Sequence, residues 1–281
     1  MLSPKQFAQN TLRRLGLYNR FKGSRLYTAY WTVMDKSLVD SELQEVDFYR
    51  SVLTGLGRGG LIFDIGANLG YKTDIFLRLG ARVISVDPDE ANKKILEEKF
   101  LKYRLTPKPV VIVNKAMSDT NSVETMWVDE PGSAKNTFSR KWVDILRTDE
   151  DRFGHKLTFG ERREVVTSTL DDLITTYGLP HFIKIDVEGY EPTVLKGLNK
   201  PVPYISFEVN LPEFRSEGLE CVELLRRLSG DGLFNYAVDC RKGLAQKEWV
   251  GADTFANLLS KSTEKSVDVF WKSSSAAQAQ A

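Results

Sequence analysis

Acidic side chains follow several short apolar runs in this 281-residue sequence, and one of them precedes a glycine-rich turn. In the segment LIFDIGANLGYKT, an apolar run reaches Asp64, and Gly66, Asn68 and Gly70 follow before an apolar-periodic stretch begins. This order predicts a strand, a tight turn and a helix, the unit that brings bare backbone up to a nucleotide-like ligand. A second run, VISVDP, places Asp87 about twenty residues later, where an acid accepts hydrogen bonds from ribose hydroxyls. The pattern predicts an adenosine cofactor.

The chemistry of the turn indicates which adenosine cofactor it suits. A dinucleotide turn has three glycines in the spacing G-x-G-x-x-G, so that pyrophosphate meets the helix N-terminus. Here the turn is GANLG, with Ala67 after Gly66 and with Asp64 two residues before the first glycine. A carboxylate that points into the turn opposes pyrophosphate but suits a cation. S-adenosylmethionine carries a sulfonium, an ammonium and no phosphate, and is therefore favoured over NAD. A glycine turn that binds nothing is the structural alternative.

A second group of acids follows two later apolar runs. FIKIDVEGYEPTVLKGL ends its apolar run at Asp186 and Glu188, and YISFEVN ends in Glu208 and Asn210. The carboxyl ends of parallel strands hold ligands in open α/β sheets, so these three acids are expected to converge there. The acids could act as bases, cap helices or pair with lysines such as Lys184. They could also hold a divalent cation, but no ligand motif is visible, and no metal is predicted.

Apolar runs and amphipathic stretches alternate through the middle of the chain. The runs predict buried strands at 61–65, 82–86, 110–114, 182–186, 203–209, 233–238 and 267–271. The stretches predict helices at 72–79, 89–102, 170–177, 190–198 and 218–229. This alternation predicts an α/β fold with a mostly parallel sheet and helices on both of its faces.

One region departs from the alternation. Residues 123–128 and 163–169 read as further strands, and a polar insertion at about 130–162 lies between them. An insertion of this length is either a functional lid or a disordered excursion. We treat it as a candidate element for recognising the substrate.

Composition limits the class of protein. Hydrophobic residues at 42% and charged residues at 27% are typical of a soluble globular protein. The net charge of +1 gives no reason to expect a nucleic-acid partner. Cys221 and Cys240 form neither a disulfide framework nor a metal-site spacing, so a cytoplasmic location is expected. No apolar stretch approaches the roughly 18 residues of a membrane span.

The two ends differ from the middle. Residues 1–55 are expected to form a helical extension, whose basic residues before Asp35 are interleaved with aromatic ones. This segment could instead be an arm for an acidic membrane surface or for an anionic substrate, or a transit-like presequence. The low-complexity end, 273–281, is expected to be disordered, and the main domain to span 56–272.

Several blocks together resemble the FkbM family of S-adenosylmethionine-dependent methyltransferases. They are FDIGANLGYKT, VDPDEANKKIL, NKAMSD, TLDDL, IKIDVEGYEPTVLKGL and SFEVN, which run in this order from about Leu61 to Asn210. The resemblance implies a class I methyltransferase fold, Rossmann-like, with a seven-stranded sheet whose last strand is antiparallel. It also implies methyl transfer to a hydroxyl of a sugar, glycan or related natural product. The cofactor residues that it implies are Asp64, Gly66, Ala67, Asn68, Gly70, Thr73, Asp87, Ser118, Asp119 and Asp186.

Methyl transfer from a sulfonium is an in-line displacement, and a hydroxyl acceptor must also lose its proton. A positioned base contributes about 10²–10⁴-fold, and Asp186, Glu188 and then Glu208 are the candidates by position. His155 lies in the insertion, and His181 precedes its strand at the wrong end. The alternative functions are an NAD-dependent oxidoreductase that acts on a sugar and a non-catalytic module that binds an adenosine ligand.

Overall fold

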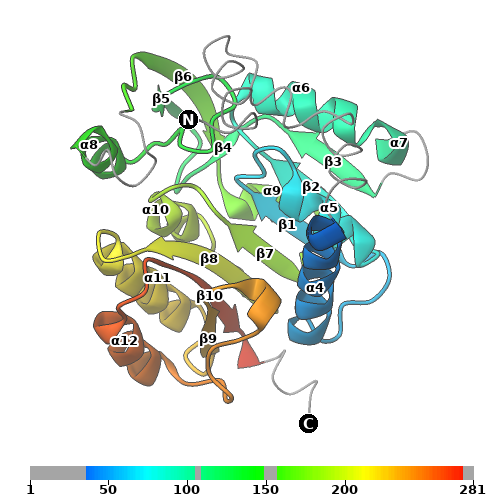
Figure 1. Ribbon diagram of the computed structural model, residues 1–281, viewed down its shortest axis with the longest axis vertical. Helices are drawn as coiled ribbons and strands as arrows, with labels where there is room; N and C mark the ends of the chain where they lie inside the picture. Colours follow the sequence, from blue (N-terminus) through cyan, green and yellow to red (C-terminus); the bar gives the residue numbers. More distant parts are fainter. Residues whose placement is uncertain (1–35, 105–108, 149–156, 275–281) are drawn as a thin grey trace.

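The structure is a computed structural model that describes residues 36–104, 109–148 and 157–274 (Figure 1). Most of the basic and aromatic N-terminal segment, His155 and most of the C-terminal end lie outside these ranges. None of the described helices is both long enough and apolar enough to cross a bilayer.

The described residues form a seven-stranded sheet in the order β3-β2-β1-β7-β8-β10-β9. β10 runs antiparallel to both of its neighbours, whereas the neighbouring pairs from β3 to β8 are parallel. The strands are β1 (Leu61–Ile65), β2 (Arg82–Val86), β3 (Val110–Val113), β7 (Phe182–Ile185), β8 (Tyr204–Asn210), β9 (Leu233–Ala237) and β10 (Ser266–Lys272). The predicted class I methyltransferase fold, with its last strand antiparallel, is therefore confirmed.

Helices cover both faces of this sheet (Figure 1). On one face pack α4 (Lys36–Val52), α5 (Tyr71–Arg78) and α6 (Glu90–Lys99), which continues into α7 (Leu101–Arg104). The other face carries α8 (Arg140–Thr148), α9 (Leu170–Tyr177), α10 (Glu191–Lys196), α11 (Arg215–Leu228) and α12 (Ala252–Lys261). A 3₁₀ turn, η1 (Cys240–Lys242), lies beside α4.

Alternation along the strands divides the core into two clusters, because neighbouring residues of a strand point to opposite faces. Phe63 belongs to the cluster under α8–α12, and its neighbour Ile62 belongs to the cluster under α4–α6. In the second cluster, the ring of Tyr49 lies 5.1 Å from that of Phe76, which lies 5.6 Å from Phe182. Tyr49 is fully buried, so the described part of the N-terminal extension belongs to the domain core.

A smaller three-stranded sheet stands beside the main one, in the order β4-β6-β5. It consists of β4 (Ala116–Met117), β5 (Val123–Val128) and β6 (Glu161–Ser168), so the two extra strands expected here are confirmed. The segment between β5 and β6 contains α8, where the sequence indicated only a polar insertion. The buried residues Trp142, Val143 and Leu146 follow helical spacing and share one side of the helix, which makes it amphipathic.

Candidate active site

The strand order reverses between β1 and β7, which lie side by side although β2 to β6 separate them in sequence. Ligands of open α/β sheets bind at such a switch point, outside the carboxyl ends of the strands. A cavity with about 700 Å³ of empty space, partly open to solvent, lies there. Its wall includes Gly66 and Asn68 after β1, Asp87 after β2, and Asp186 and Glu188 after β7.

The glycine turn after β1 brings backbone to the cavity. Gly66 has a φ of 81°, and a Cβ there would lie 1.8 Å from the carbonyl oxygen of Asp186. Any larger residue would push β1 and β7 apart, so the position requires glycine. Asn68 also has a positive φ, and its backbone N–H donates to Oδ2 of Asp87 over 2.8 Å. The turn is thus fastened to the acid at the end of β2.

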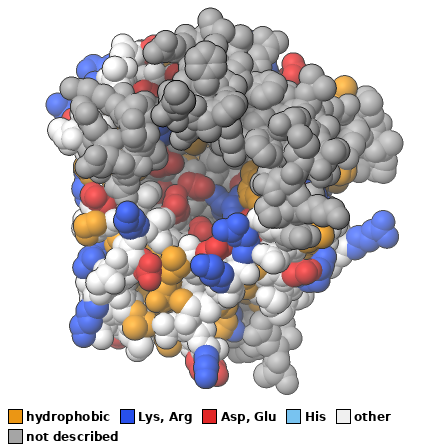
Figure 2. Space-filling view, in the orientation of Figure 1, with side chains coloured by type: hydrophobic (Ala, Val, Ile, Leu, Met, Phe, Trp, Pro, Cys, Tyr) orange, Lys and Arg blue, Asp and Glu red, His pale blue; other side chains and the backbone are white. Residues whose placement is uncertain are grey.

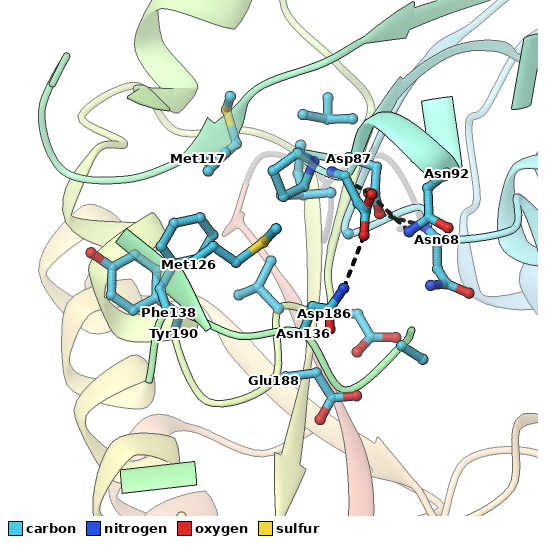
Figure 3. A pocket seen from close by; sticks show the side chains of 18 of the residues that line it. Asn68, Asp87, Asn92, Met117, Met126, Asn136, Phe138, Asp186, Glu188 and Tyr190 are labelled. Atoms are coloured by element: carbon cyan, nitrogen blue, oxygen red, sulfur yellow. Dashed lines mark hydrogen bonds between the residues drawn. The ribbon is translucent and has the colours of Figure 1, made fainter. Parts of the chain in front are cut away.

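Asp87 presents a fixed carboxylate to the cavity. Its Oδ1 accepts hydrogen bonds from the backbone N–H of Asp89 at 2.9 Å and from Nδ2 of Asn92 at 3.0 Å (Figure 3). Burial raises the pKa of Asp87 to about 6, against the lowering effect of these hydrogen bonds. Asn92 was not predicted as a site residue, although its position in the helix that follows Asp87 could have indicated this role.

The opposite wall of the cavity is apolar. Figure 3 shows Met126, Phe138 and Tyr190 facing the polar group of Asp87, Asn68 and Asn92 across the hollow. The rings of Phe138 and Tyr190 lie 5.5 Å apart at 35°, which makes a flat surface of the kind that an adenine ring packs against. These residues come from separate elements, so the sequence gives no local signal for them.

The other predicted cofactor residues lie around the cavity rather than on its wall. Asp64 is fully buried and accepts the hydroxyl of Thr73 at 2.6 Å, and burial raises its pKa. Oδ1 of Asp64 has no hydrogen-bond partner within the described part of the chain. Ala67 and Gly70 belong to the turn, and Gly70 closes it against α6. Their position indicates that they shape the turn.

Ser118 and Asp119 were expected near the adenine. Ser118 is buried and donates its hydroxyl to Glu124 at 2.6 Å, and Asp119 is exposed. Neither residue is part of the cavity wall, which is reached by Met117 just before them.

The loop after β7 accounts for the residue types at Glu188, Gly189 and Glu191 of the IDVEGYE block. Glu188 has a φ of 56°, a conformation that costs free energy for a residue with a side chain. Gly189 leaves no room for a Cβ, which would lie 2.3 Å from the ring of Phe214. The buried carboxyl of Glu191 accepts the backbone N–H groups of Val187 and Gly189 at 3.1 and 3.2 Å. The loop is therefore held in one shape, with Glu188 aimed at the cavity.

The three predicted catalytic acids meet, as expected. One carboxylate oxygen of each of Asp186, Glu188 and Glu208 lies within 4.8 Å of the others. Burial raises the pKa of Asp186, but the ammonium of Lys184 at 2.7 Å outweighs burial and leaves the pKa below its usual range. Burial and the charge of Asp186 raise the pKa of Glu208 to about 8. Figure 2 shows acidic side chains in a hollow on this face, with Lys and Arg side chains beside them.

Glu188 is held from the insertion. The indole N–H of Trp142 donates to its Oε2, and the hydroxyl of Thr137 donates to its backbone carbonyl at 2.8 Å. Burial raises the pKa of Glu188 well above its usual range, and the negative charge of Asp186 adds to this effect.

The insertion is also tied to α6. The carboxylate of Asp89 accepts the backbone N–H of Gly132 at 2.7 Å and Nδ2 of Asn136 at 2.9 Å. His181, by contrast, lies at the amino end of β7, where its ring bonds the carbonyl of Thr54. The described part of the insertion thus forms part of the site, and His181 lies away from it.

The model of the Methyltransferase FkbM domain family matches residues 64–230, more than half of the chain. The chain belongs to the FkbM methyltransferase family. Its cofactor is therefore S-adenosylmethionine, and the protein is an S-adenosylmethionine-dependent methyltransferase. No curated protein matches the sequence.

Solved structures of other methyltransferases are similar to this chain at low identity. The C-terminal domain of precorrin-6Y C5,15-methyltransferase from Rhodobacter capsulatus is 14% identical, with 79% of this chain and 84% of that chain covered and a TM-score of 0.38. A TehB-like methyltransferase from Corynebacterium glutamicum is 10% identical, with 82% and 87% covered and a TM-score of 0.41. A putative RNA methyltransferase from Pyrococcus horikoshii is 12% identical, with 83% and 81% covered and a TM-score of 0.38.

The residues of the FkbM site fit the methyl donor. Gly66 leaves backbone bare at the switch point, and the carboxylate of Asp87 suits two vicinal ribose hydroxyls. The flat apolar wall of Phe138 and Tyr190 suits a purine ring. The ionised carboxylate of Asp186, on the cavity wall, suits a positively charged group of the methyl donor and would repel a phosphate.

Proposed function

We propose that this methyltransferase methylates a hydroxyl oxygen on a sugar, glycan or related natural product. The observation that carries the proposal is the position of Glu188, a carboxyl with a raised pKa on the wall of the cofactor cavity. A hydroxyl must lose its proton as it attacks, and a base whose pKa lies nearer to that of the operating solution removes it more readily. S-adenosylmethionine supplies the activated methyl group.

The three acids then take different roles. Glu188 is the proposed base, and because Trp142 holds its Oε2, Oε1 is placed to receive the proton. Asp186, kept ionised by Lys184, accepts a hydrogen bond from the acceptor and orients it. Glu208, with a pKa of about 8, is protonated at neutral pH and shares its proton with Asp186.

We further propose that the cofactor is held by the turn from Gly66 to Gly70 and by Asp87. Asp64 and Thr73 support the turn from beneath, through the hydrogen bond that joins them. Ser118 acts on the adenine wall indirectly, because its hydroxyl and the phenol of Tyr190 share Glu124 as a partner.

Transfer of a labelled methyl group tests the acceptor class. Purified protein and methyl-labelled S-adenosylmethionine are incubated with extracts of the native host, and the extracts are separated into carbohydrate, lipid, protein and nucleic-acid fractions. Label is expected in a carbohydrate or glycolipid as a base-stable methyl ether. Glu188→Gln is expected to lower the rate by about 10²–10⁴-fold with little change in the affinity for S-adenosylhomocysteine. Label in protein or nucleic acid would overturn the proposed acceptor.

A further inference from the structure

A second hollow lies at the same edge of the sheet, on the side covered by α4 and α5. It has about 570 Å³ of empty space, part of which is open to solvent. Its wall is formed by Glu45 of α4, Lys72 of α5, Asp268 of β10 and the segment Asp239, Cys240 and Arg241.

This hollow is close to the proposed catalytic acids. Asp268 is paired with Glu208 in the register of β10 and β8, and residues paired in this way point to the same face of the sheet. Lys72 connects the two regions. Burial lowers its pKa, and Asp268 and Asp186 both lie close enough to oppose that effect with their charges. The hollow therefore lies on the same face of the sheet as Glu208, beside the proposed catalytic acids.

The wall carries charges of both signs in compensating pairs. Lys72 is paired with Glu45. Arg241 donates from Nε and one terminal nitrogen to the two oxygens of Asp239, each over 2.8 Å. Two cations thus face three carboxylates. The carboxylates would repel an anion, and Lys72 and Arg241 would repel a cation. A neutral ligand with many hydroxyls is therefore favoured. Such a ligand can donate to the carboxylates and accept from the cations without disrupting the pairs.

An exposed aromatic ring stands at the rim. Tyr71 precedes Lys72, and 42% of its surface is exposed. The hydroxyl of Ser41 bonds the phenol of Tyr71 and also accepts from Nη1 of Arg241 at 3.2 Å, which places this ring beside the wall. The C–H face of a pyranose packs on an exposed tyrosine, whose ring offers apolar area with little entropy to lose.

We propose that this hollow is the acceptor subsite and that it binds a pyranose unit. The sugar lies with one face on Tyr71 and with its hydroxyls bonded to Lys72, Asp268 and the Arg241–Asp239 pair. The proposal rests on the proposed function and names the part of the molecule that selects the acceptor.

Binding of simple sugars tests the subsite separately from catalysis. Methyl glycosides of glucose, galactose, mannose and rhamnose are added to the full-length protein saturated with S-adenosylhomocysteine, and binding is followed by saturation-transfer NMR. Tyr71→Ala removes the ring, and Tyr71→Phe keeps it. Leu179→Ala is the matched control, because Leu179 is 56% exposed and lies just before β7 at its amino end.

At least one of these glycosides is expected to bind. Tyr71→Ala should weaken it about fivefold or more, whereas Tyr71→Phe and Leu179→Ala should change it less than about twofold. All three variants should keep the affinity for S-adenosylhomocysteine, which also shows that they are folded. The proposed subsite is excluded if none of the glycosides binds. It is also excluded if Tyr71→Ala binds a glycoside with the same affinity as the unchanged protein. The methyl-transfer experiment tests the proposed function independently, because that proposal fails if no label enters carbohydrate.

Discussion

The indole nitrogen of Trp142 donates a hydrogen bond over 2.9 Å to Oε2 of Glu188, a residue 46 positions later in the chain. Trp142 belongs to α8 and is 1% exposed, and its ring packs edge-on against Phe214 at 5.1 Å. Phe214 in turn contacts Gly189. The insertion therefore fixes both the carboxylate and the loop that carries it, which makes Trp142 a positioning residue for the proposed base.

Trp142→Phe removes this donor and keeps an aromatic ring. The indole hydrogen bond lowers the pKa of Glu188, so its loss should move the acidic limb of the pH–rate profile to higher pH. At neutral pH, kcat should fall about tenfold, while the affinity for S-adenosylhomocysteine stays within about twofold. Trp127→Phe is the matched control, because Trp127 is half-buried on β5 and its ring contacts Arg147 and Arg162. An unshifted pH profile in Trp142→Phe would show that the contact is only structural.

Gly66→Ala tests the close contact between β1 and β7. The new Cβ would lie 1.8 Å from the carbonyl oxygen of Asp186, so the turn must move away from the cavity. The affinity for S-adenosylhomocysteine, measured by calorimetry, should fall about 100-fold or more. Gly57→Ala is the control, because a Cβ there meets nothing within 4 Å. Equal affinities of the two variants would exclude the turn as the cofactor site.

Asp87→Asn tests the ribose contact through its pH dependence. The pKa of Asp87 is raised to about 6, so the free protein loses this carboxylate as the pH falls below that value. If the ionised form binds ribose, the dissociation constant for S-adenosylhomocysteine should rise by about tenfold for each pH unit below 6. Asp87→Asn should bind weakly but with little dependence on pH. A pH-independent affinity in the unchanged protein would contradict this role.

Much of the fold could be predicted from the sequence, because buried strands and short loops leave local signals. β1, β2 and β5 occupy the expected residues, and α9 spans the expected 170–177. The convergence of Asp186, Glu188 and Glu208 was also predictable, because the carboxyl ends of neighbouring parallel strands lie at the same edge of a sheet. Where boundaries moved, as in the break between α6 and α7 near Phe100, the element type was still right.

The parts that escaped prediction mostly depend on contacts between distant segments. α8 and α12 were not expected, although their buried apolar residues recur at helical spacing and offer a local signal. The apolar wall of Met126, Phe138 and Tyr190 comes from three elements brought together by the fold. For the same reason, the bond from Trp142 to Glu188 has no signature in either segment.

Glu191→Gln tests how the buried carboxyl of Glu191 stabilises the loop after β7. Burial raises the pKa of Glu191 from 4.5 to about 7, so the folded state holds its proton more tightly than the unfolded state does. This contribution to stability is fully present below pH 4.5 and is lost as the pH rises through 7. The loss amounts to about 3 kcal/mol, at about 1.4 kcal/mol for each pH unit.

Glutamine keeps an oxygen that can accept the N–H groups of Val187 and Gly189 but does not ionise. The free energy of unfolding, measured with urea at pH 5 and pH 8, should therefore decline less in Glu191→Gln than in the unchanged protein. At pH 8 the variant should be the more stable of the two. Glu220→Gln, on the exposed side of α11, should follow the unchanged protein at both pH values. A parallel decline in Glu191→Gln would show that Glu191 is already ionised in the folded loop, and that the two N–H groups alone offset its burial.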